Sequence, residues 1–293
     1  MRKKALTLTV VANMTSNYSE GLGNIASVQK VFKNRKVYTI RSRESLKNSL
    51  MVQAGMYDDL QTEVDGATQK LVTEDLNAAT CRALEGGYMS TKGTTYVRKS
   101  SLYLTDAISC ESFVNETRFH NNLYLAGNFA EANGMNIQND ANKVGLMPYQ
   151  YEYDKSLKIY SLTIDLEMVG KDENFKAEAD KEEKAARVKA ILDAVETLSL
   201  VVKGNLDNAE PIFVVGGVSD RKTHYFENVV HVEEDKLEIS QDLIDKVDIG
   251  YDCGLLRGKM LANEQEIEQK LKPMTIPAFF KKMKDEVDIY YEV

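Results

Sequence analysis

Residues 160–168 alternate strictly between apolar and polar side chains, and this pattern constrains the fold more than any other feature of the chain. The apolar positions are Tyr160, Leu162, Ile164, Leu166 and Met168. Successive side chains of a β-strand point to opposite faces, so a period of two predicts a strand with one buried face. Residues 6–13 repeat the pattern. We therefore predict that the chain opens with a similar half-buried strand.

Helical patterns lie beside these strands. Ser42 is a good N-cap for a helix whose apolar side holds Leu46, Leu50, Met51 and Ala54. Residues 188–202 place apolar side chains at spacings of three and four, which predicts a helix that ends at Gly204. Further helices are expected near residues 263–271 and 277–287.

The remaining segments give the organisation of the chain. Thr15–Lys36 is predicted to be a long polar loop, and Pro211–Val215 a short buried strand that runs into a glycine pair. Residues 60–150 are predicted to be an insertion with a helix at Thr73–Leu84. The order of strands and helices favours a single α+β domain over residues 1–293, of the RNA-recognition or ferredoxin-like type.

Composition excludes several classes of protein. Three cysteines, Cys81, Cys110 and Cys253, lie far apart without metal-ligand spacing, so we predict no disulfide and no zinc site. Thr7 and Thr9 interrupt the apolar start of the chain, which argues against a signal peptide. No apolar stretch is long enough for a membrane helix. We expect a cytoplasmic protein.

Charge is distributed unevenly. The net charge of -8 argues against a nucleic-acid binder, but residues 1–50 carry ten lysines and arginines against two glutamates, a net charge of +8. The rest of the chain therefore sums to -16. This asymmetry predicts a basic binding face on an acidic body, with a solvated basic stretch as the alternative.

The first candidate site is the start of the helix that follows Ser42. Arg43 and Lys47 lie four residues apart, so they project from one helical face, with Arg41 just before it. A helix N-terminus offers free N–H groups and a dipole that favours an anion. These residues predict a phosphate site, and a solvated helix edge is the alternative.

Other candidates lie in loops. Asn13, Asn17 and Asn24 with Tyr18 and nearby lysines suit single-stranded nucleic acid, although a flexible surface loop has the same composition. Gly216 and Gly217, followed by Arg221 and Lys222, would let a phosphodiester chain approach closely, unless they form a hairpin turn. Arg98 and Lys99 are further candidates for contact with a nucleic-acid backbone.

Signals for enzymes are weak. Gly21–Ala26 matches a dinucleotide fingerprint, but residues 13–20 separate it from its strand and no acidic residue follows at the expected distance. His120, His224 and His231 share no metal-ligand spacing. We predict no catalytic residue, metal or cofactor, with an oxidoreductase and a ribonuclease that uses Glu20 or a histidine as the alternatives.

Several stretches, taken in order, are similar to the DevR-type branch of the CRISPR Cascade backbone family, the Cas-seven subunits of type I-B systems. The similar stretches run to about residue 235 and comprise Leu6–Asn13, Asn17-Tyr18, Gly23-Asn24, Ile40–Lys47, Gly87–Met89, Lys99–Ser109, Tyr149–Gly170 and Val214–Gly217.

The resemblance implies an RNA-recognition-like palm with fingers at about residues 60–150 and a thumb at about 205–235. It implies a non-catalytic subunit that polymerises along a guide RNA, with other Cascade subunits and target DNA as partners. Asn17, Asn24, Ser42, Arg43 and Lys47 would hold guide phosphates. Gly216, Gly217, Arg221 and Lys222 would begin the thumb.

Overall fold

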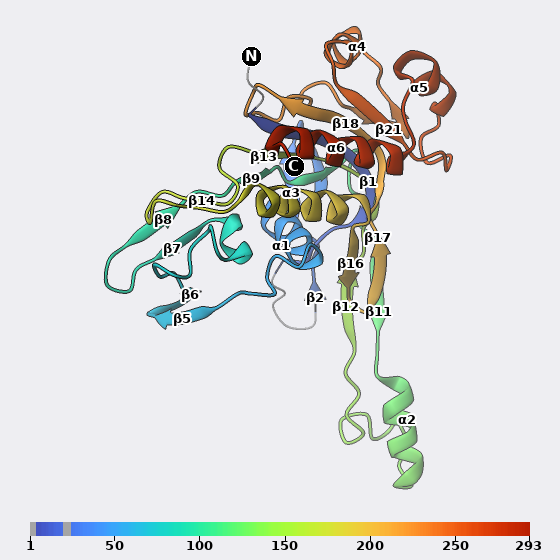
Figure 1. Ribbon diagram of the computed structural model, residues 1–293. Helices are drawn as coiled ribbons and strands as arrows, with labels where there is room; N and C mark the ends of the chain where they lie inside the picture. The colour runs from blue at the N-terminus through green and yellow to red at the C-terminus, as the bar shows by residue number, and fades with distance from the viewer. Residues whose placement is uncertain (1–3, 20–24) are drawn as a thin grey trace.

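The centre of the protein is an antiparallel sheet of eight strands. The computed structural model describes residues 4–19 and 25–293, and orders the strands β21-β18-β1-β13-β10-β4-β3, with β9 also paired to β13 (Figure 1). Their bounds are β1 Ala5–Thr15, β3 Lys30–Lys33, β4 Lys36–Arg41, β9 Leu102–Leu104, β10 Ala107–Ser109, β13 Lys155–Asp165, β18 Pro211–Ser219 and β21 Asp252–Leu255.

The two strands that the alternation predicts lie side by side at the middle of the sheet. β1 pairs with β13 from Ala5↔Asp165 to Thr15↔Lys155, and with β18 on its other edge. Both strands are confirmed, but β1 is not half-buried as predicted. Its polar face is covered as well, because Thr7 Oγ1 donates to the carbonyl of Thr223 at 2.9 Å.

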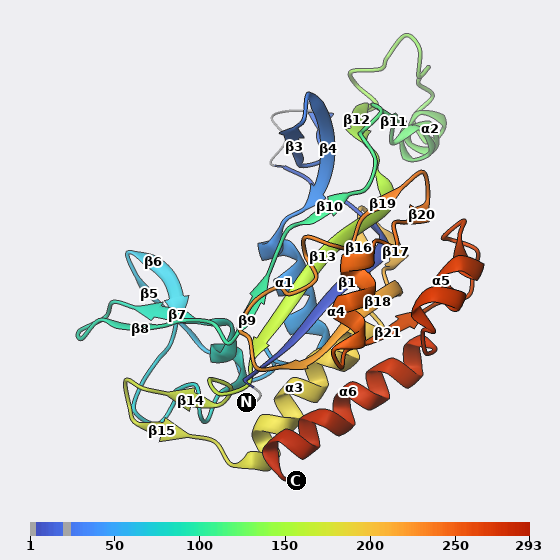
Figure 2. The same cartoon turned by 90° about the horizontal axis from the view of Figure 1, so that it is seen from above.

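One face of the sheet is covered by three helices, α1 Arg43–Gln53, α3 Lys181–Glu196 and α6 Ile276–Tyr291 (Figures 1 and 2). Leu6, Leu8 and Val10 of β1 join their apolar stripes in the main core. Burial of these apolar surfaces is the main force that holds the layers together.

The opposite face carries a smaller core. Residues 220–231, the short pair β19 Val232–Glu233 and β20 Lys236–Leu237, and the helices α4 Gln241–Asp248 and α5 Glu264–Leu271 pack there. Phe226 and Val230 contact the same cluster as Val11 of β1. This cover leaves part of the sheet face open beside β10 and β4.

Two structures project from this body (Figure 1). We call the first the lobe; it holds β5 Thr62–Asp65, β6 Ala67–Lys70, η1 Arg82–Gly86, β7 Tyr88–Ser90 and β8 Tyr96–Arg98, and β14 Lys171–Asp172 and β15 Ala177–Glu178 lie beside it. We call the second the arm; it is the ribbon of β11 Thr117–His120 and β12 Tyr149–Glu152, tipped by α2 Leu123–Ala132. β2 Ile25–Ala26 pairs with β12.

Several local predictions are wrong. The helix over residues 188–202 ends at Glu196, and β16 Ser199–Val202 then pairs with β17 Asn205–Asn208. Lys203 and Gly204 between them have φ of 50° and 77°, the conformation of a tight hairpin turn. No α-helix forms at Thr73–Leu84, where the Thr80 hydroxyl donates to the Asp75 carbonyl instead, and only the last three residues enter the short 3-10 helix η1.

Other segments are more regular than predicted. Part of the Thr15–Lys36 loop is strand β3, and residues 102–109 of the expected insertion belong to the central sheet as β9 and β10. The helices at the C-terminal end are confirmed as α5 and α6. The chain has a mixed α/β architecture built on a large antiparallel sheet.

Candidate nucleic-acid interface

The start of α1 is held by the end of β1. Ser42 has the extended backbone of an N-cap, and its hydroxyl accepts the Ser45 N–H at 3.2 Å. The Ser42 N–H donates to Asn17 Oδ1 at 2.7 Å. The structure thus brings Asn17 and Ser42 together, as the sequence led us to expect.

The N–H groups at this helix start are less free than predicted. The Arg43 N–H donates to Asp106 Oδ1 at 2.7 Å, and the Ser45 N–H donates to the Ser42 hydroxyl. The Arg43 side chain is 65% exposed and its Nε lies 2.7 Å from Glu44 Oε1. The hydrogen bond to Glu44 raises the pKa of Arg43. Arg43 therefore presents a permanent cation to solvent.

Lys47 lies one turn further along the same face of α1. Its Nζ donates to the Gly86 carbonyl at 2.9 Å and to Ser100 Oγ at 2.7 Å, and among the described residues no carboxylate pairs with it. Burial lowers the pKa of Lys47 to about 8, and the nearby cations Lys70 and Arg98 act in the same direction. An added anion would relieve this unfavourable charge.

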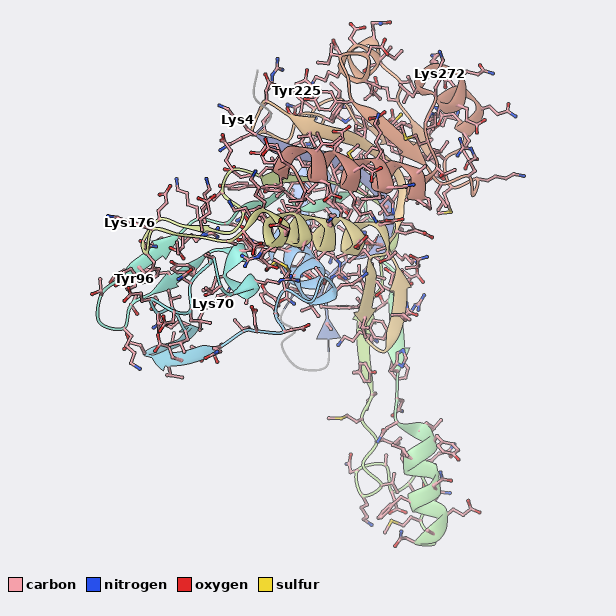
Figure 3. All side chains as sticks on the ribbon, viewed as in Figure 1. Lys4, Lys70, Tyr96, Lys176, Tyr225 and Lys272 are labelled. Atoms are coloured by element: carbon pink, nitrogen blue, oxygen red, sulfur yellow. The ribbon has the colours of Figure 1, made fainter. Side chains whose placement is uncertain are left out.

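Lys70 is a cation near this site that the sequence reasoning missed. It reaches from β6 of the lobe, and its Nζ donates to the carbonyls of Ala83 and Gly87 at 2.6 and 3.1 Å (Figure 3). No local pattern marks it, because only the folded lobe brings it toward α1.

Two hollows meet beside Arg43. The first, with a volume of about 420 Å³, is lined by Arg43, Lys47, Ser100, Tyr103 and His224, among others. The second, of about 640 Å³, lies between residues 227–232 and strands β10 and β13, and also includes Lys33 and Asn34. Arg43 and Leu104 line both, so the two hollows adjoin, and we call them together the groove.

A basic hairpin borders this groove. Lys33 and Lys36 pair at the ends of β3 and β4, and Asn34 and Arg35 between them have φ of 51° and 62°. Lys33, Arg35 and Lys36 are exposed, and none forms an ion pair with a carboxylate in the described part of the chain. Lys33 and Asn34 line the second hollow, so the cations of this hairpin lie at one side of the groove.

Arg41 and Arg98 lie inside the protein, where they donate hydrogen bonds to carbonyl groups of the protein backbone. Arg41 is 4% exposed, with Nε donating to the Thr15 carbonyl at 3.0 Å. Arg98 donates to the carbonyls of Lys171 and Met168 at 2.7 and 2.9 Å. These contacts give both guanidinium groups a structural role. Lys99, in contrast, is exposed.

The glycine pair is not a turn. Gly216 and Gly217 lie within β18, opposite Leu8 and Thr7, where a Cβ on Gly216 would collide with the Thr7 carbonyl oxygen. Arg221 and Lys222 follow at the far end of β1 from Asn17. Lys222 pairs with Asp165 and Glu167 at 3.0 and 2.9 Å. Two carboxylates therefore neutralise Lys222.

Two candidates from the first loop remain apart from these contacts. Asn13 is half-buried in β1, opposite Leu157. Asn24 lies outside the described residues, as do Glu20 and most of the Gly21–Ala26 motif. Ala26 is in strand β2, so no helix opens there, and β1 is antiparallel to both neighbours. Both observations contradict a dinucleotide-binding fold.

The three cysteines are free thiols, and within residues 4–19 and 25–293 no group of His, Cys, Asp or Glu has the arrangement of a metal site. No helix in the described part of the chain is long and apolar enough to cross a membrane.

A family model provides the identification. The model described as "CRISPR-associated negative auto-regulator DevR/Csa2" matches residues 59–241. The chain belongs to the DevR/Csa2 family. The match begins after α1 and covers both the lobe and the arm. No curated protein sequence matches the chain.

Solved structures agree on the fold of this DevR/Csa2 chain. A chain of a "CRISPR RNA-guided surveillance complex, pre-nicking" superposes with a TM-score of 0.65 at 12% identity, covering 97% of this chain and 100% of that one. A chain of a "CRISPR RNA-guided surveillance complex" gives a TM-score of 0.54 at 14% identity, with coverage of 96% and 99%. The resemblance seen in the sequence is thereby confirmed.

Proposed function

We propose that this DevR/Csa2 chain is the guide-RNA-binding backbone subunit of a type I-B CRISPR surveillance complex, and that it holds the guide by its phosphates. Family membership and the shared fold support this role. The observation that carries it is the groove, in which Arg43 and Lys47 of one helical face lie together beside the basic β3–β4 hairpin.

Phosphate contacts explain why a guide of any sequence would fit. Arg43 offers a planar guanidinium group, and Lys47 a desolvated ammonium group that lacks a carboxylate partner among the described residues. Such contacts position a nucleic acid but read no bases. The subunit would act by geometry, without catalysis, presenting the guide for pairing with target DNA.

The fold offers a candidate palm. Along the chain, β1, α1, β10, β13, α3 and β18 give the order β-α-β-β-α-β of ferredoxin-like and RNA-recognition domains. The lobe and the arm are then the two parts of the fingers. Residues 205–235, with Gly216, Gly217, Arg221 and Lys222, would supply the thumb, although Pro211–Ser219 of this stretch is the core strand β18.

Exposed apolar side chains support contacts between copies. They gather at the end of the arm, on Leu123, Tyr124, Leu125, Phe129 and Met147, and again in the lobe, on Val64, Met89 and Val97. The arm and the lobe project in different directions (Figure 1). Contact between two different surfaces of identical chains builds an open filament when the rotation between copies does not close a ring, and a filament is the assembly that a guide-bound backbone needs. Other Cascade subunits would bind the two ends of this filament.

The salt dependence of RNA binding tests the groove. Arg43→Ala with Lys47→Ala removes two phosphate contacts, so we expect weaker binding of single-stranded RNA and a salt slope that is less steep by about 1.4. Lys181→Ala with Lys281→Ala is the matched control, because it removes equal charge from exposed lysines of α3 and α6 that do not line the groove. An unchanged affinity and slope in the groove variant would refute this placement.

A further inference from the structure

Three aromatic side chains lie together on one face of the arm. His120 of β11 pairs with Tyr149 of β12, and the next pair on that face places Tyr151 opposite Arg118. The ring centroids of His120 and Tyr149 are 5.4 Å apart at 21°, and those of Tyr149 and Tyr151 are 6.2 Å apart at 26°. The rings of His120 and Tyr151 are also close, 4.9 Å apart at 32°, so the three rings form a compact group, which we call the aromatic row.

The aromatic row is anchored at its inner end and open at its outer end. Tyr151 is 8% exposed, and its hydroxyl lies 2.9 Å from His120 Nε2. Tyr18 packs edge-on against Tyr151 and donates its hydroxyl to the Glu152 carbonyl at 2.8 Å. Tyr149 is 39% exposed, and His120 is also exposed. A flat ligand can therefore reach rings that are already held in place.

Cations stack on two aromatic rings that neighbour the aromatic row. The guanidinium of Arg118 lies 3.5 Å from the ring centroid of Tyr153, and Lys203 Nζ lies 5.1 Å from that of Tyr18. Two carboxylates of this ribbon and its flank are already paired, Glu152 with Lys30 at 2.6 Å and Glu116 with Arg118 at 4.0 Å. Aromatic rings interleaved with cations are typical of surfaces that bind single-stranded nucleic acid.

The aromatic row differs in chemistry from the tip of the arm. Leucine and methionine side chains are exposed at the tip, which suits contact with protein. The row holds rings and polar atoms instead. It also lies close to the basic hairpin, because the Lys30–Glu152 ion pair joins β3 to β12. A strand whose phosphates lie on that hairpin would carry its bases toward the row.

We propose that the aromatic row stacks unpaired bases of a single-stranded nucleic acid. This inference rests on the proposed function, because it gives the strand held by the groove a second contact, made to its bases rather than its phosphates. Either RNA or DNA supplies such bases, and stacking on a π-face tolerates any base.

Short oligoadenosine strands that carry 2-aminopurine test the proposal. The protein contains no tryptophan, so the emission of the probe can be excited selectively. Tyr149→Leu should weaken binding of RNA, of DNA or of both by roughly five-fold or more. It should reduce quenching of the probe while leaving the salt slope unchanged. Tyr149→Phe keeps the ring and should bind as the natural protein does.

The matched control is Phe119→Leu, which removes an exposed ring from the opposite face of the same ribbon. Equal losses in Phe119→Leu and Tyr149→Leu would overturn the proposal, as would equal binding of an abasic strand. If the natural protein binds strands with the expected salt slope but Tyr149→Leu has no effect, only the stacking site fails. If the natural protein binds no strand, the guide-binding function fails with it.

Discussion

Lys47 combines burial with repulsion from neighbouring cations, and this makes its charge sensitive to pH. Its pKa of about 8 lies below the ordinary value of 10.5. Between these values the unfolded chain binds more protons than the folded one, so this residue makes the folded protein more stable as pH rises from about 8 to about 10.5.

RNA binding should change in the opposite direction. Because Lys47 loses its charge as pH rises through about 8, we expect affinity for single-stranded RNA to fall between pH 7 and pH 9, measured at constant ionic strength. Lys47→Arg keeps its charge throughout and should show a flatter profile. Identical pH profiles for the two proteins would show that Lys47 contacts no phosphate.

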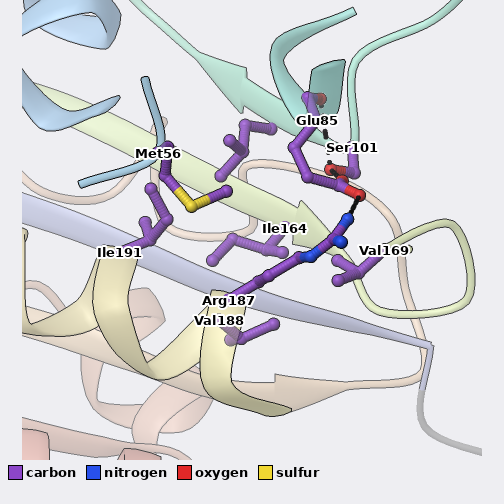
Figure 4. A pocket seen from close by; sticks show the side chains of 9 residues that line it. Met56, Glu85, Ser101, Ile164, Val169, Arg187, Val188 and Ile191 are labelled. Carbon is purple, nitrogen blue, oxygen red and sulfur yellow. Dashed lines mark hydrogen bonds and ion pairs between the residues drawn. The ribbon is translucent and has the colours of Figure 1, made fainter. Parts of the chain in front are cut away.

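Glu85 is a buried carboxylate that holds separate elements of the fold together. It lies in the interior, where it accepts from Ser101 Oγ and pairs with Arg187 at 3.0 Å (Figure 4). Arg98 approaches its other oxygen at 3.5 Å. The carboxylate therefore joins η1 of the lobe to α3 of the body.

Removing this carboxylate should be costly. Glu85→Ala leaves the buried Arg98 without its anion and leaves Arg187 with Glu183 alone, so we expect the free energy of unfolding to fall by about 3–5 kcal/mol in urea denaturation. Glu268→Ala is the control, because its pair with Arg257 is exposed and should contribute less than about 1 kcal/mol. A similar loss in both variants would contradict the role of Glu85.

At the scale of elements, local signals decided what could be predicted. Ser42 marks the start of α1 by a cap that depends on neighbouring residues alone, and that prediction is confirmed. The β3–β4 hairpin was missed because its polar composition is also that of a loop, although two strand-like runs flank Asn34-Arg35. The aromatic row could not be predicted, since His120 and Tyr149 meet only when the ribbon pairs.

A glycine in β18 allows this strand to lie close to the backbone of β1. Gly216→Ala would drive a methyl group into the Thr7 carbonyl oxygen and to 2.9 Å from Leu8 Cα, both backbone atoms of the central strand. We expect a loss of about 3 kcal/mol in thermal or urea unfolding. Gly258→Ala has no atom within 4 Å of its Cβ and should be nearly neutral. Unchanged stability in Gly216→Ala would contradict the close pairing of β1 and β18.

At the scale of the whole molecule, the acidic net charge and the group of cations beside the groove fit together. Cations of the first 50 residues lie on the β3–β4 hairpin and at the start of α1, beside the open part of the sheet face. Carboxylates elsewhere keep the outer surface acidic. The sequence alone predicted this division of charge, but not the groove, which forms only where residues 227–232 cross the sheet.

The central claim is that the protein holds a guide RNA. The most direct measurement is the ratio of nucleic-acid to protein absorbance of the chain purified from its own host, followed by sequencing of any nucleic acid bound to it. We predict short RNAs of uniform length that carry CRISPR repeat ends. A nucleic-acid-free protein that also fails to bind added guide RNA would contradict the account.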